Sequence, residues 1–363
     1  MFVCKFCSNG CMLTVARRDC RVLLVSGNRC PKGVAYAHLS LKDRESGMFL
    51  PAESSTYSPE IIARVLACYG LILSEVQPGV FIQGSPERAA FRTVVSVTAG
   101  ARYVVEQLHP GTEIVKRTIA RRVADCVAEG LPVIPYLLGI DGEAIQVCDG
   151  LSWQVCPFPA WVALDRLTYW RDAWRGESLA RVLLELYRIA DARAFDGPTF
   201  SLPTYVRDLA STIKHQQPEL HTQLVPYLEW FEDVLFAQYE ALPCGFCHGD
   251  PHPMNVLWGD NRIVALIDFE FSGIKPRMYD AALIVGCVGA EAPEALNGPL
   301  VTKFIDVMTE NAVIDSNRKQ EFFAFVAALR FAWLSEWLRR EDEEMVGFEL
   351  FYLEYLKNQG GRV

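Results

Sequence analysis

A short run in the second half of the chain gathers residue types that could carry out group transfer. His248, Gly249 and Asp250 form a tight polar turn that presents a carboxylate, and Asn255 follows five residues later. Two β-like stretches come next, NVLW and IVALID, joined by the turn GDN, and Asp268 closes the second stretch. Because a hairpin brings its outer strand ends together, we expect Asn255 and Asp268 to lie close to each other.

These residue types are the ones that phosphoryl transfer needs. That reaction requires little covalent chemistry from the protein, but it does require a group that orients the attacking hydroxyl and accepts its proton. Asp250 suits that task. Asn255 and Asp268 offer the hard oxygen ligands that magnesium prefers. The alternative is an ordinary loop in which Asp250 caps a helix, and it accounts poorly for four spaced residues in a strand–turn–strand context.

The sequence HGDPHPMN followed by IDFE resembles the catalytic and metal-binding motifs of the aminoglycoside phosphotransferase/choline kinase family. The likeness covers roughly residues 58–357 in architecture and residues 246–282 in clear motif. It implies an ATP-dependent transfer of the γ-phosphate to a hydroxyl of a small molecule, such as a sugar, an amino alcohol or an aminoglycoside-like compound. The implied roles are Asp250 as catalytic base, Asn255 and Asp268 as Mg²⁺ ligands, His248 as support of the loop and Asp280 as its brace.

The elements that must position these residues fall into two parts. Residues 58–157 combine a helix, the strand patterns GVFIQG, FRTVVSV, ARYVVEQL and PVIPYLLG, and a basic amphipathic helix. Residues 158–363 are mostly helical. We therefore predict an α+β, protein-kinase-like fold with a small β-rich N-lobe and a larger helical C-lobe. Residues 42–57, rich in Ser, Pro and Glu, would link it to a separate module over residues 1–41.

The N-lobe departs from the family pattern at the position of the lysine that normally contacts the ATP phosphates. Glu106 stands at that place in the second strand of the predicted hairpin. The helix that follows, which normally supplies a glutamate, is basic instead. One hypothesis is a charge exchange, in which Glu106 pairs with Arg117 or Arg121 and that cation meets the phosphates. The alternative is that these residues form solvated faces, as runs of charge usually do.

Two further segments are placed to contact a nucleotide. QGSPER, residues 83–88, occupies the position of a phosphate-covering loop, and the backbone amides of Gly84 and Ser85 could approach a phosphate. WQVCPF, residues 153–158, occupies the position of the hinge between the lobes. We expect the backbone there, near Pro157, to hold adenine.

Cysteines are concentrated at the N-terminus. Cys4, Cys7, Cys11 and Cys30 give three close thiols and one distant one, a pattern that suits a four-ligand soft-metal site. The segment 3–38 is similar to the N-terminal iron–sulfur segment of molybdopterin-dependent oxidoreductases and to a short domain of unknown function. This resemblance implies a [4Fe–4S] cluster on the four cysteines. Zn²⁺ is the alternative, since four thiolates also suit tetrahedral zinc.

Two other groups of residues have both a functional and a structural interpretation. Cys244 and Cys247 form a CxxC directly before the catalytic loop, which could be a redox switch but more often provides buried apolar side chains. An aromatic stretch at the start of the C-lobe could line an acceptor pocket, but we expect it mainly to pack the interface between the lobes. The stretch comprises Trp161, Tyr169, Trp170 and Trp174.

Composition limits the remaining classes of function. The chain has 363 residues and a net charge of −9, which argues against a dedicated nucleic-acid binder. The sequence has neither an apolar run long enough for a membrane span nor a secretory signal, so a cytoplasmic location is expected. Two rival functions stay open: a redox-sensing regulatory pseudokinase, and an electron-transfer protein whose cysteine module binds a redox partner.

Overall fold

The computed structural model describes residues 2–3, 12–18, 21–26, 57–85 and 88–360. The N-terminal part of these forms a small antiparallel sheet in the order β1–β2–β3. Cys4, Cys7, Cys11 and Cys30 lie outside the described residues, so the metal module stays a prediction. The three strands are β1 (Phe2–Val3), β2 (Met12–Arg18) and β3 (Arg21–Ser26).

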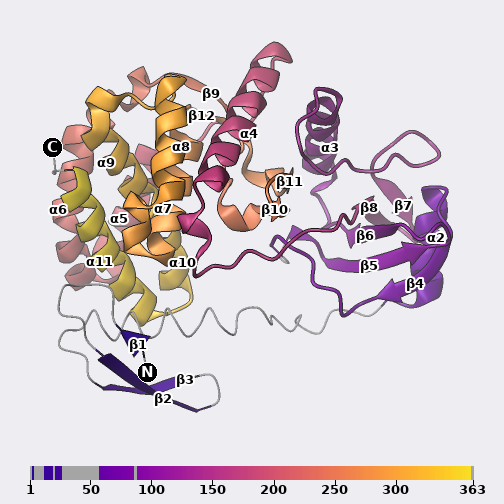
Figure 1. Ribbon diagram of the computed structural model, residues 1–363, viewed down its shortest axis with the longest axis horizontal. Coiled ribbons are helices and arrows are strands. Elements are labelled where there is room, and N and C mark those ends of the chain that lie inside the picture. Colours follow the sequence, from indigo (N-terminus) through magenta and orange to yellow (C-terminus); the bar gives the residue numbers. More distant parts are fainter. Residues whose placement is uncertain (1, 4–11, 19–20, 27–56, 86–87, 361–363) are drawn as a thin grey trace.

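The N-lobe is a five-stranded antiparallel sheet in the order β4–β5–β6–β8–β7, with one helix packed on it (Figure 1). Helix α2 begins at Pro59, a residue suited to the first helical turn, and buries Ile62, Val65 and Leu66. Their spacing of three and one places them on a single helix face. The elements are α2 (Pro59–Cys68), β4 (Leu73–Gln77), β5 (Phe91–Val97), β6 (Arg102–Gln107), α3 (Glu113–Ala128), β7 (Gln146–Cys148) and β8 (Leu151–Pro157).

Two of the strand predictions for this lobe were wrong. The segment GVFIQG is an irregular loop, and the edge strand is β4, which comes just before it. The physical reason is Arg92, whose guanidinium donates to the carbonyl oxygens of Ile82, Gly84 and Ser85 and so replaces a strand partner. The segment PVIPYLLG is also irregular, with one bridge between Val133 and Leu266.

The C-lobe is helical and holds the larger of the two hydrophobic cores. Helix α7 lies at its centre and is buried along most of its length, because nearly all of its side chains are apolar. The sheet lobe followed by the helical lobe confirms the predicted α+β order. The helices are α4 (Ala173–Ala192), α5 (Leu202–Gln216), α6 (Pro218–Val234), α7 (Tyr279–Glu291), α8 (Pro299–Glu310), α9 (Lys319–Leu329), α10 (Phe331–Arg339) and α11 (Glu343–Gly360).

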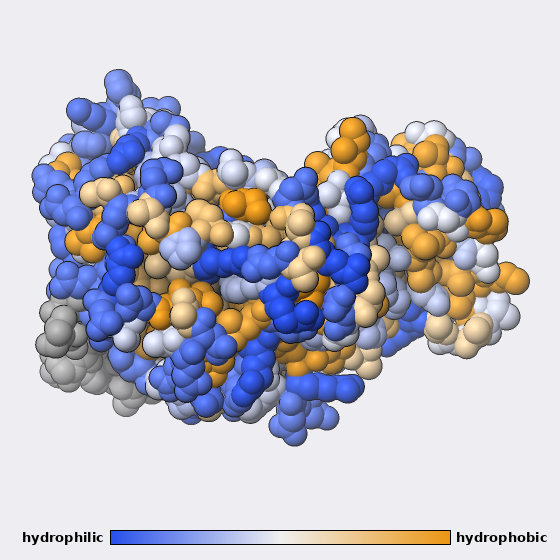
Figure 2. Space-filling view, turned by 90° about the horizontal axis from the view of Figure 1, so that it is seen from above, coloured by the Kyte–Doolittle hydropathy of each residue, from blue (hydrophilic) through white to orange (hydrophobic). Residues whose placement is uncertain are grey.

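Two small antiparallel hairpin-like pairs lie between the lobes and carry the predicted catalytic residues. Strand β9 (Cys244–Cys247) pairs with β12 (Gly273–Pro276), and β10 (Val256–Trp258) pairs with β11 (Ile263–Leu266). In the space-filling view the surface dips between the two lobes (Figure 2). Within the described part of the chain, none of the helices has the length and apolar character needed to cross a bilayer.

Candidate active site

The catalytic loop begins where β9 ends and is fixed from below by helix α7. The carboxylate of Asp280, in the first turn of α7, accepts hydrogen bonds from the backbone N–H groups of His248 and Gly249, both at 2.8 Å. It also accepts one from the hydroxyl of Tyr187 at 3.1 Å. Asp280 is fully buried, and three donors compensate for its lost hydration. It therefore braces the loop, as the family resemblance implies.

Gly249 is required by the geometry of this turn. Its φ is +87°, a left-handed conformation that residues with a side chain rarely adopt. A Cβ at this position would also lie 2.2 Å from the carbonyl oxygen of Phe271. The loop can thus approach the segment after Asp268 only because residue 249 is glycine.

His248 connects the catalytic loop to the end of β11. Its Nε2 lies 3.1 Å from the carbonyl oxygen of Ile267, and its Nδ1 accepts the backbone N–H of Asp250 at 3.2 Å. Burial lowers the pKa of His248 to about 3, so the ring is neutral. Since Nδ1 accepts, the network assigns the proton to Nε2. The predicted supporting role of this side chain agrees with these contacts.

The carboxylate of Asp250 is held by the side chain predicted to act beside it. Asn255 Nδ2 donates to the Asp250 backbone oxygen at 2.9 Å and to its carboxylate Oδ2 at 3.0 Å. Both bonds use the amide nitrogen, which leaves the Asn255 Oδ1 oxygen as a ligand for a cation. Burial raises the pKa of Asp250 to about 7, against the opposing effects of Arg88 and Asn255.

Asp268 follows β11 in a strained backbone conformation, with φ of +69° and ψ of +65°. The residue before it, Ile267, donates its N–H to the backbone oxygen of Asn255 at 3.0 Å, so the two predicted Mg²⁺ ligands lie on adjoining backbone. Burial and the hydrogen bond with Glu270 raise the pKa of Asp268. Its Oδ1 is buried and, among the described residues, accepts no hydrogen bond. A buried carboxylate oxygen that accepts no hydrogen bond and lies beside a second carboxylate suits a divalent cation.

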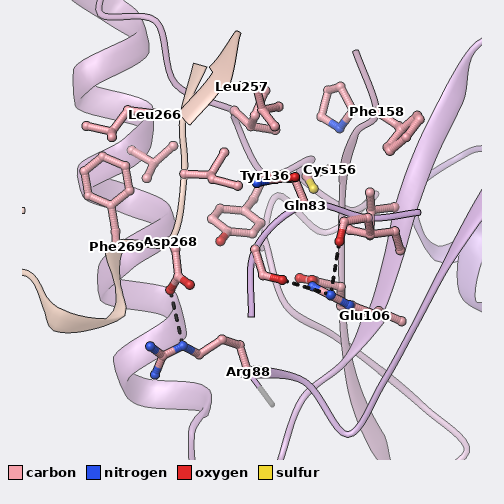
Figure 3. A pocket seen from close by; sticks show the side chains of 18 of the residues that line it. Gln83, Arg88, Glu106, Tyr136, Cys156, Phe158, Leu257, Leu266, Asp268 and Phe269 are labelled. Carbon is pink, nitrogen blue, oxygen red and sulfur yellow. Dashed lines mark hydrogen bonds and ion pairs between the residues drawn. The ribbon is translucent and has the colours of Figure 1, made fainter. Parts of the chain in front are cut away.

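A cleft between the lobes contains Asp268 and four of the residues predicted to bind the nucleotide. Its volume is about 110 Å³, and Gly84, Ser85, Glu106 and Pro157 line it. In Figure 3, Arg88 points from the N-lobe loop toward Asp268, while Tyr136 and Cys156 lie deeper in the cleft. The loop over the cleft is held in place by Arg92 through its carbonyl oxygens.

The predicted charge exchange does not form with the arginines that the sequence suggested. Arg117 Nη1 pairs with Glu143 at 2.6 Å on the surface. Glu106 accepts a hydrogen bond at 2.6 Å from Gln154, its partner on β8 in the sheet register. Arg117 and Arg121 are not among the residues that line the cleft. The reason is helical geometry, because both arginines are on faces of α3 turned away from it.

Lys116 is one of two site residues that the sequence reasoning missed. It is only 5% exposed, lines the cleft and forms an ion pair with Glu270 across the two lobes. The sequence did contain a signal. Lys116 precedes Ile119 and Val123 by three and seven residues, so it occupies the apolar face of α3. A lysine in the buried stripe of a helix, unlike its arginine neighbours, needs a partner in the interior.

Arg88 was also missed. Its Nε lies 3.3 Å from Asp268 Oδ1, an ion pair in which neither atom makes a hydrogen bond within the described part of the structure. Its guanidinium stacks on the Phe271 ring, 4.4 Å from the centroid. Arg88 is the last residue of QGSPER, the loop that the sequence analysis singled out for its glycine and serine.

The cysteine pair and the aromatic stretch are mainly structural. Cys244 and Cys247 stand three residues apart on β9, so their side chains leave opposite faces of the strand, and Cys247 is buried. That geometry does not favour a disulfide switch. In the aromatic stretch Tyr169 is buried and Trp174 packs edge-to-face on Trp258 at 5.7 Å. Trp161 is the member of the stretch that lines the cleft.

Several solved structures have the same fold. An aminoglycoside phosphotransferase from Alicyclobacillus acidocaldarius superposes with a TM-score of 0.57 at 16% identity, over 86% of this chain and 99% of that one. Amicoumacin kinase, in complex with AMP-PNP, Ca²⁺ and Ami, gives a TM-score of 0.58 at 12% identity, over 84% and 94%. Spectinomycin phosphotransferase with ADP and spectinomycin gives 0.55 at 15% identity, over 84% and 94%. These likenesses confirm the kinase-like fold.

Sequence comparison identifies the family. A homoserine kinase from Granulibacter bethesdensis is 32% identical over 120 residues, which cover 31% of this chain and 37% of the relative. The chain thus matches little more than a third of the length of that relative. Residues 82–309 match the phosphotransferase enzyme family. Since this match spans more than half of the 363 residues and contains the whole catalytic loop, the chain belongs to the phosphotransferase enzyme family.

Proposed function

We propose that this chain is an ATP-dependent phosphotransferase that moves the γ-phosphate to a hydroxyl group of a small molecule. The observation that carries the proposal is the convergence of Asp250, Asn255 and Asp268 on adjoining backbone, with the Asp250 carboxylate held by the Asn255 amide. Such an arrangement orients a hydroxyl and binds a cation, which are the main requirements of phosphoryl transfer.

Asp250 accepts a hydrogen bond from the acceptor hydroxyl and takes its proton as the hydroxyl oxygen attacks the γ-phosphorus of ATP and the bond from that phosphorus to the leaving ADP oxygen breaks. Asn255 keeps the carboxylate in one orientation through its Nδ2 donor. Asp280 and the neutral His248 fix the loop on which Asp250 lies, so the carboxylate needs no rearrangement during the reaction.

Asn255 Oδ1 and Asp268 would hold Mg²⁺, which supplies positive charge beside the phosphate oxygens when bound. Lys116 and Arg88 are the cations of the cleft that we assign to the phosphates of ATP. Lys116 is pre-oriented by Glu270, and Arg88 already meets the carboxylate at which the metal would bind. In this assignment the phosphate-binding lysine comes from α3 instead of from the sheet, where Glu106 stands.

The acceptor belongs to the broad class of hydroxylated small molecules. Homoserine kinase is a relative by sequence, and the similar solved structures include aminoglycoside and spectinomycin phosphotransferases. We therefore expect an alcohol oxygen as the nucleophile.

The test is ATP turnover against a panel of hydroxylated metabolites. Asp250→Asn should lower turnover roughly 10²–10⁴-fold, the usual contribution of a positioned base, with little change in nucleotide affinity. Asp306→Asn, on the exposed surface of α8, serves as the matched control and should keep full turnover. Turnover that persists in Asp250→Asn would refute the assignment. Nucleotide binding without turnover in the parent would favour a pseudokinase.

The N-terminal cysteines support a separate proposal, which rests on sequence alone. We propose a [4Fe–4S] cluster on Cys4, Cys7, Cys11 and Cys30, with contact to a redox partner in the cytoplasm. A brown protein with visible absorbance after anaerobic purification is the expected result. A colourless protein with one Zn²⁺ per chain would show that the four cysteines bind zinc and not an iron–sulfur cluster.

A further inference from the structure

A second cavity lies on the other side of the catalytic loop, within the C-lobe. Its volume is about 1030 Å³, and it extends from Gly249 and Asp250 to helices α10 and α11. This volume is at the upper end of the roughly 300–1000 Å³ typical of ligand pockets. An acceptor of amino-acid size would leave most of it filled with water. The cavity therefore fits a considerably larger molecule.

The wall of this cavity is rich in aromatic rings. They come from the segment before α5, from α5 itself, from α7 and from the two C-terminal helices, so five parts of the lobe contribute. Aromatic side chains offer large apolar contact areas with little conformational freedom to lose. The rings are Phe200, Tyr205, Tyr279, Trp333, Trp337 and Phe348.

The cationic side chains in the wall already have polar partners within the protein. Its four cationic side chains are accompanied by five carboxylates, so the lining is close to neutral. A polycationic acceptor would need carboxylates without protein partners, since a buried ion pair must outweigh the loss of hydration. The contacts of the cations are Arg166 with Glu291 at 3.1 Å, Arg340 with Glu336 at 2.5 Å, Arg330 with Glu349, and Lys275 with the carbonyl oxygen of Phe271 at 2.6 Å.

The polar side chains at the two ends of the cavity differ in their surroundings. Asp250, His252 and Glu270 lie there, with His252 Nε2 3.7 Å from the Asp250 carboxylate. The opposite end is formed by Trp333, Trp337 and the apolar side chains of α11. The cations at that end lie over these rings, Arg330 over Trp333 and Arg340 over Trp337, and Arg340 also pairs with Glu336. A molecule that matches both ends has a hydroxyl-bearing head and an apolar body.

We propose that the acceptor is an uncharged amphiphile, whose hydroxylated head meets Asp250 and whose apolar body lies against α10. This inference rests on the proposed phosphotransferase function and narrows its substrate class. It excludes both a free amino acid and a polycationic sugar as the preferred acceptor.

The test measures binding of n-alkyl β-D-glucosides, from methyl to octyl, below their micelle concentrations. Calorimetry with the full-length protein gives Kd for each chain length. If each added methylene enters the apolar end, Kd should fall about fourfold per methylene. L-Homoserine and kanamycin, measured in parallel, should bind more weakly than octyl glucoside.

A blocked cavity provides the specificity control. Ala332 lines the cavity yet is exposed, so Ala332→Arg places a long charged side chain at its opening without disturbing the core. This variant should lose the dependence on chain length. Ala192→Arg, at the exposed end of α4, is the matched control and should keep it.

Binding and transfer are read separately. If Kd in the parent does not change with chain length, or if L-homoserine or kanamycin binds more tightly than octyl glucoside, the amphiphile proposal is wrong. Either result leaves the proposed phosphotransferase function unaffected. A graded series with ATP-dependent phosphorylation of the glucoside supports both proposals. A graded series in a protein that transfers no phosphate to any acceptor would support the binding site and overturn the phosphotransferase function.

Discussion

The two cavities that meet at the catalytic carboxylates differ about tenfold in volume. The cleft between the lobes measures about 110 Å³, and the cavity inside the C-lobe about 1030 Å³. Glu270 lines both of them. Both linings combine apolar and charged side chains. The lining of the narrow cleft comes from two lobes, whereas that of the wide cavity comes from the C-lobe alone and includes several aromatic rings.

The difference follows from what holds each cavity in shape. The cleft is narrowed by contacts that bridge the lobes: the Lys116–Glu270 and Arg88–Asp268 pairs and the hydrogen bond from Gln83 Nε2 to the Met254 carbonyl oxygen at 2.5 Å. The wide cavity lies among helices that share one hydrophobic core. The volume of the cleft therefore depends on lobe opening, and that of the cavity on packing. A nucleotide needs more than 110 Å³, so we expect the lobes to separate when it binds.

The largest effect should come from the residue that would hold the metal in the cleft. Asp268→Asn removes the carboxylate but not the volume, and should lower turnover roughly 10²–10³-fold, as expected when one stabilising charge is lost from the transition state. Nucleotide affinity in the variant should be the same in Mg²⁺ and in EDTA. Asp260→Asn, exposed in the turn of the same β10–β11 pair, should behave as the parent. If Mg²⁺ still changes the nucleotide affinity of the Asp268→Asn variant, the metal binds at another site.

The next effect concerns the buried pair between the lobes. Lys116→Met leaves the largely buried Glu270 without its cation, which should destabilise the protein by about 3 kcal/mol and weaken ATP binding. Urea unfolding followed by tryptophan fluorescence measures the stability. The double change Lys116→Met with Glu270→Gln should recover most of the stability but not the ATP affinity.

The neighbouring Arg117–Glu143 pair tests whether the loss of stability depends on where the cation lies or only on the removal of a positive charge. Arg117→Met breaks an exposed pair with Glu143 and should change the unfolding free energy by less than about 1 kcal/mol. Equal destabilisation by the Lys116 and Arg117 changes would contradict the claim that only Lys116 belongs to the cleft.

A smaller effect should follow when a bridging hydrogen bond is removed. Gln83→Ala loses the contact with Met254, and nucleotide association should be roughly 2- to 10-fold faster, since one hydrogen bond contributes about 0.5–1.5 kcal/mol. Stopped-flow fluorescence with a labelled nucleotide measures the rate. Gln77→Ala, which removes a contact with Glu75 on β4, is the control. An unchanged rate in Gln83→Ala would show that this bond does not limit opening.

The smallest effect is expected from the arginines of α3 that the sequence suggested. Arg117→Ala and Arg121→Ala should bind ATP with a Kd within about twofold of the parent, because neither side chain lines the cleft. A tenfold loss of affinity in Arg121→Ala would restore the charge exchange with Glu106. Isothermal titration calorimetry with ATP measures Kd and distinguishes an unchanged affinity from a tenfold loss.

The sequence by itself determined the catalytic loop, the family and the order of the lobes. These are local properties: the spacing of His248, Asp250, Asn255 and Asp268 fits one strand–turn–strand arrangement, and the apolar period separates strands from helices. It did not determine which cation serves the cleft. The apolar period of α3 places Lys116 on its buried face and Arg117 beside it on the exposed face, but only the packing of the lobes shows that Lys116 meets Glu270 in the cleft.

The shape and the lining of the two cavities were also determined only by the tertiary structure. Arg92 holds the loop at residues 82–85 through carbonyl oxygens, a contact that strand propensity does not anticipate. The wide cavity combines residues from 166 to 348, which no local pattern relates to one another. A site assembled from distant segments depends on how the helices pack, so its volume and its aromatic wall appear only once the fold is complete.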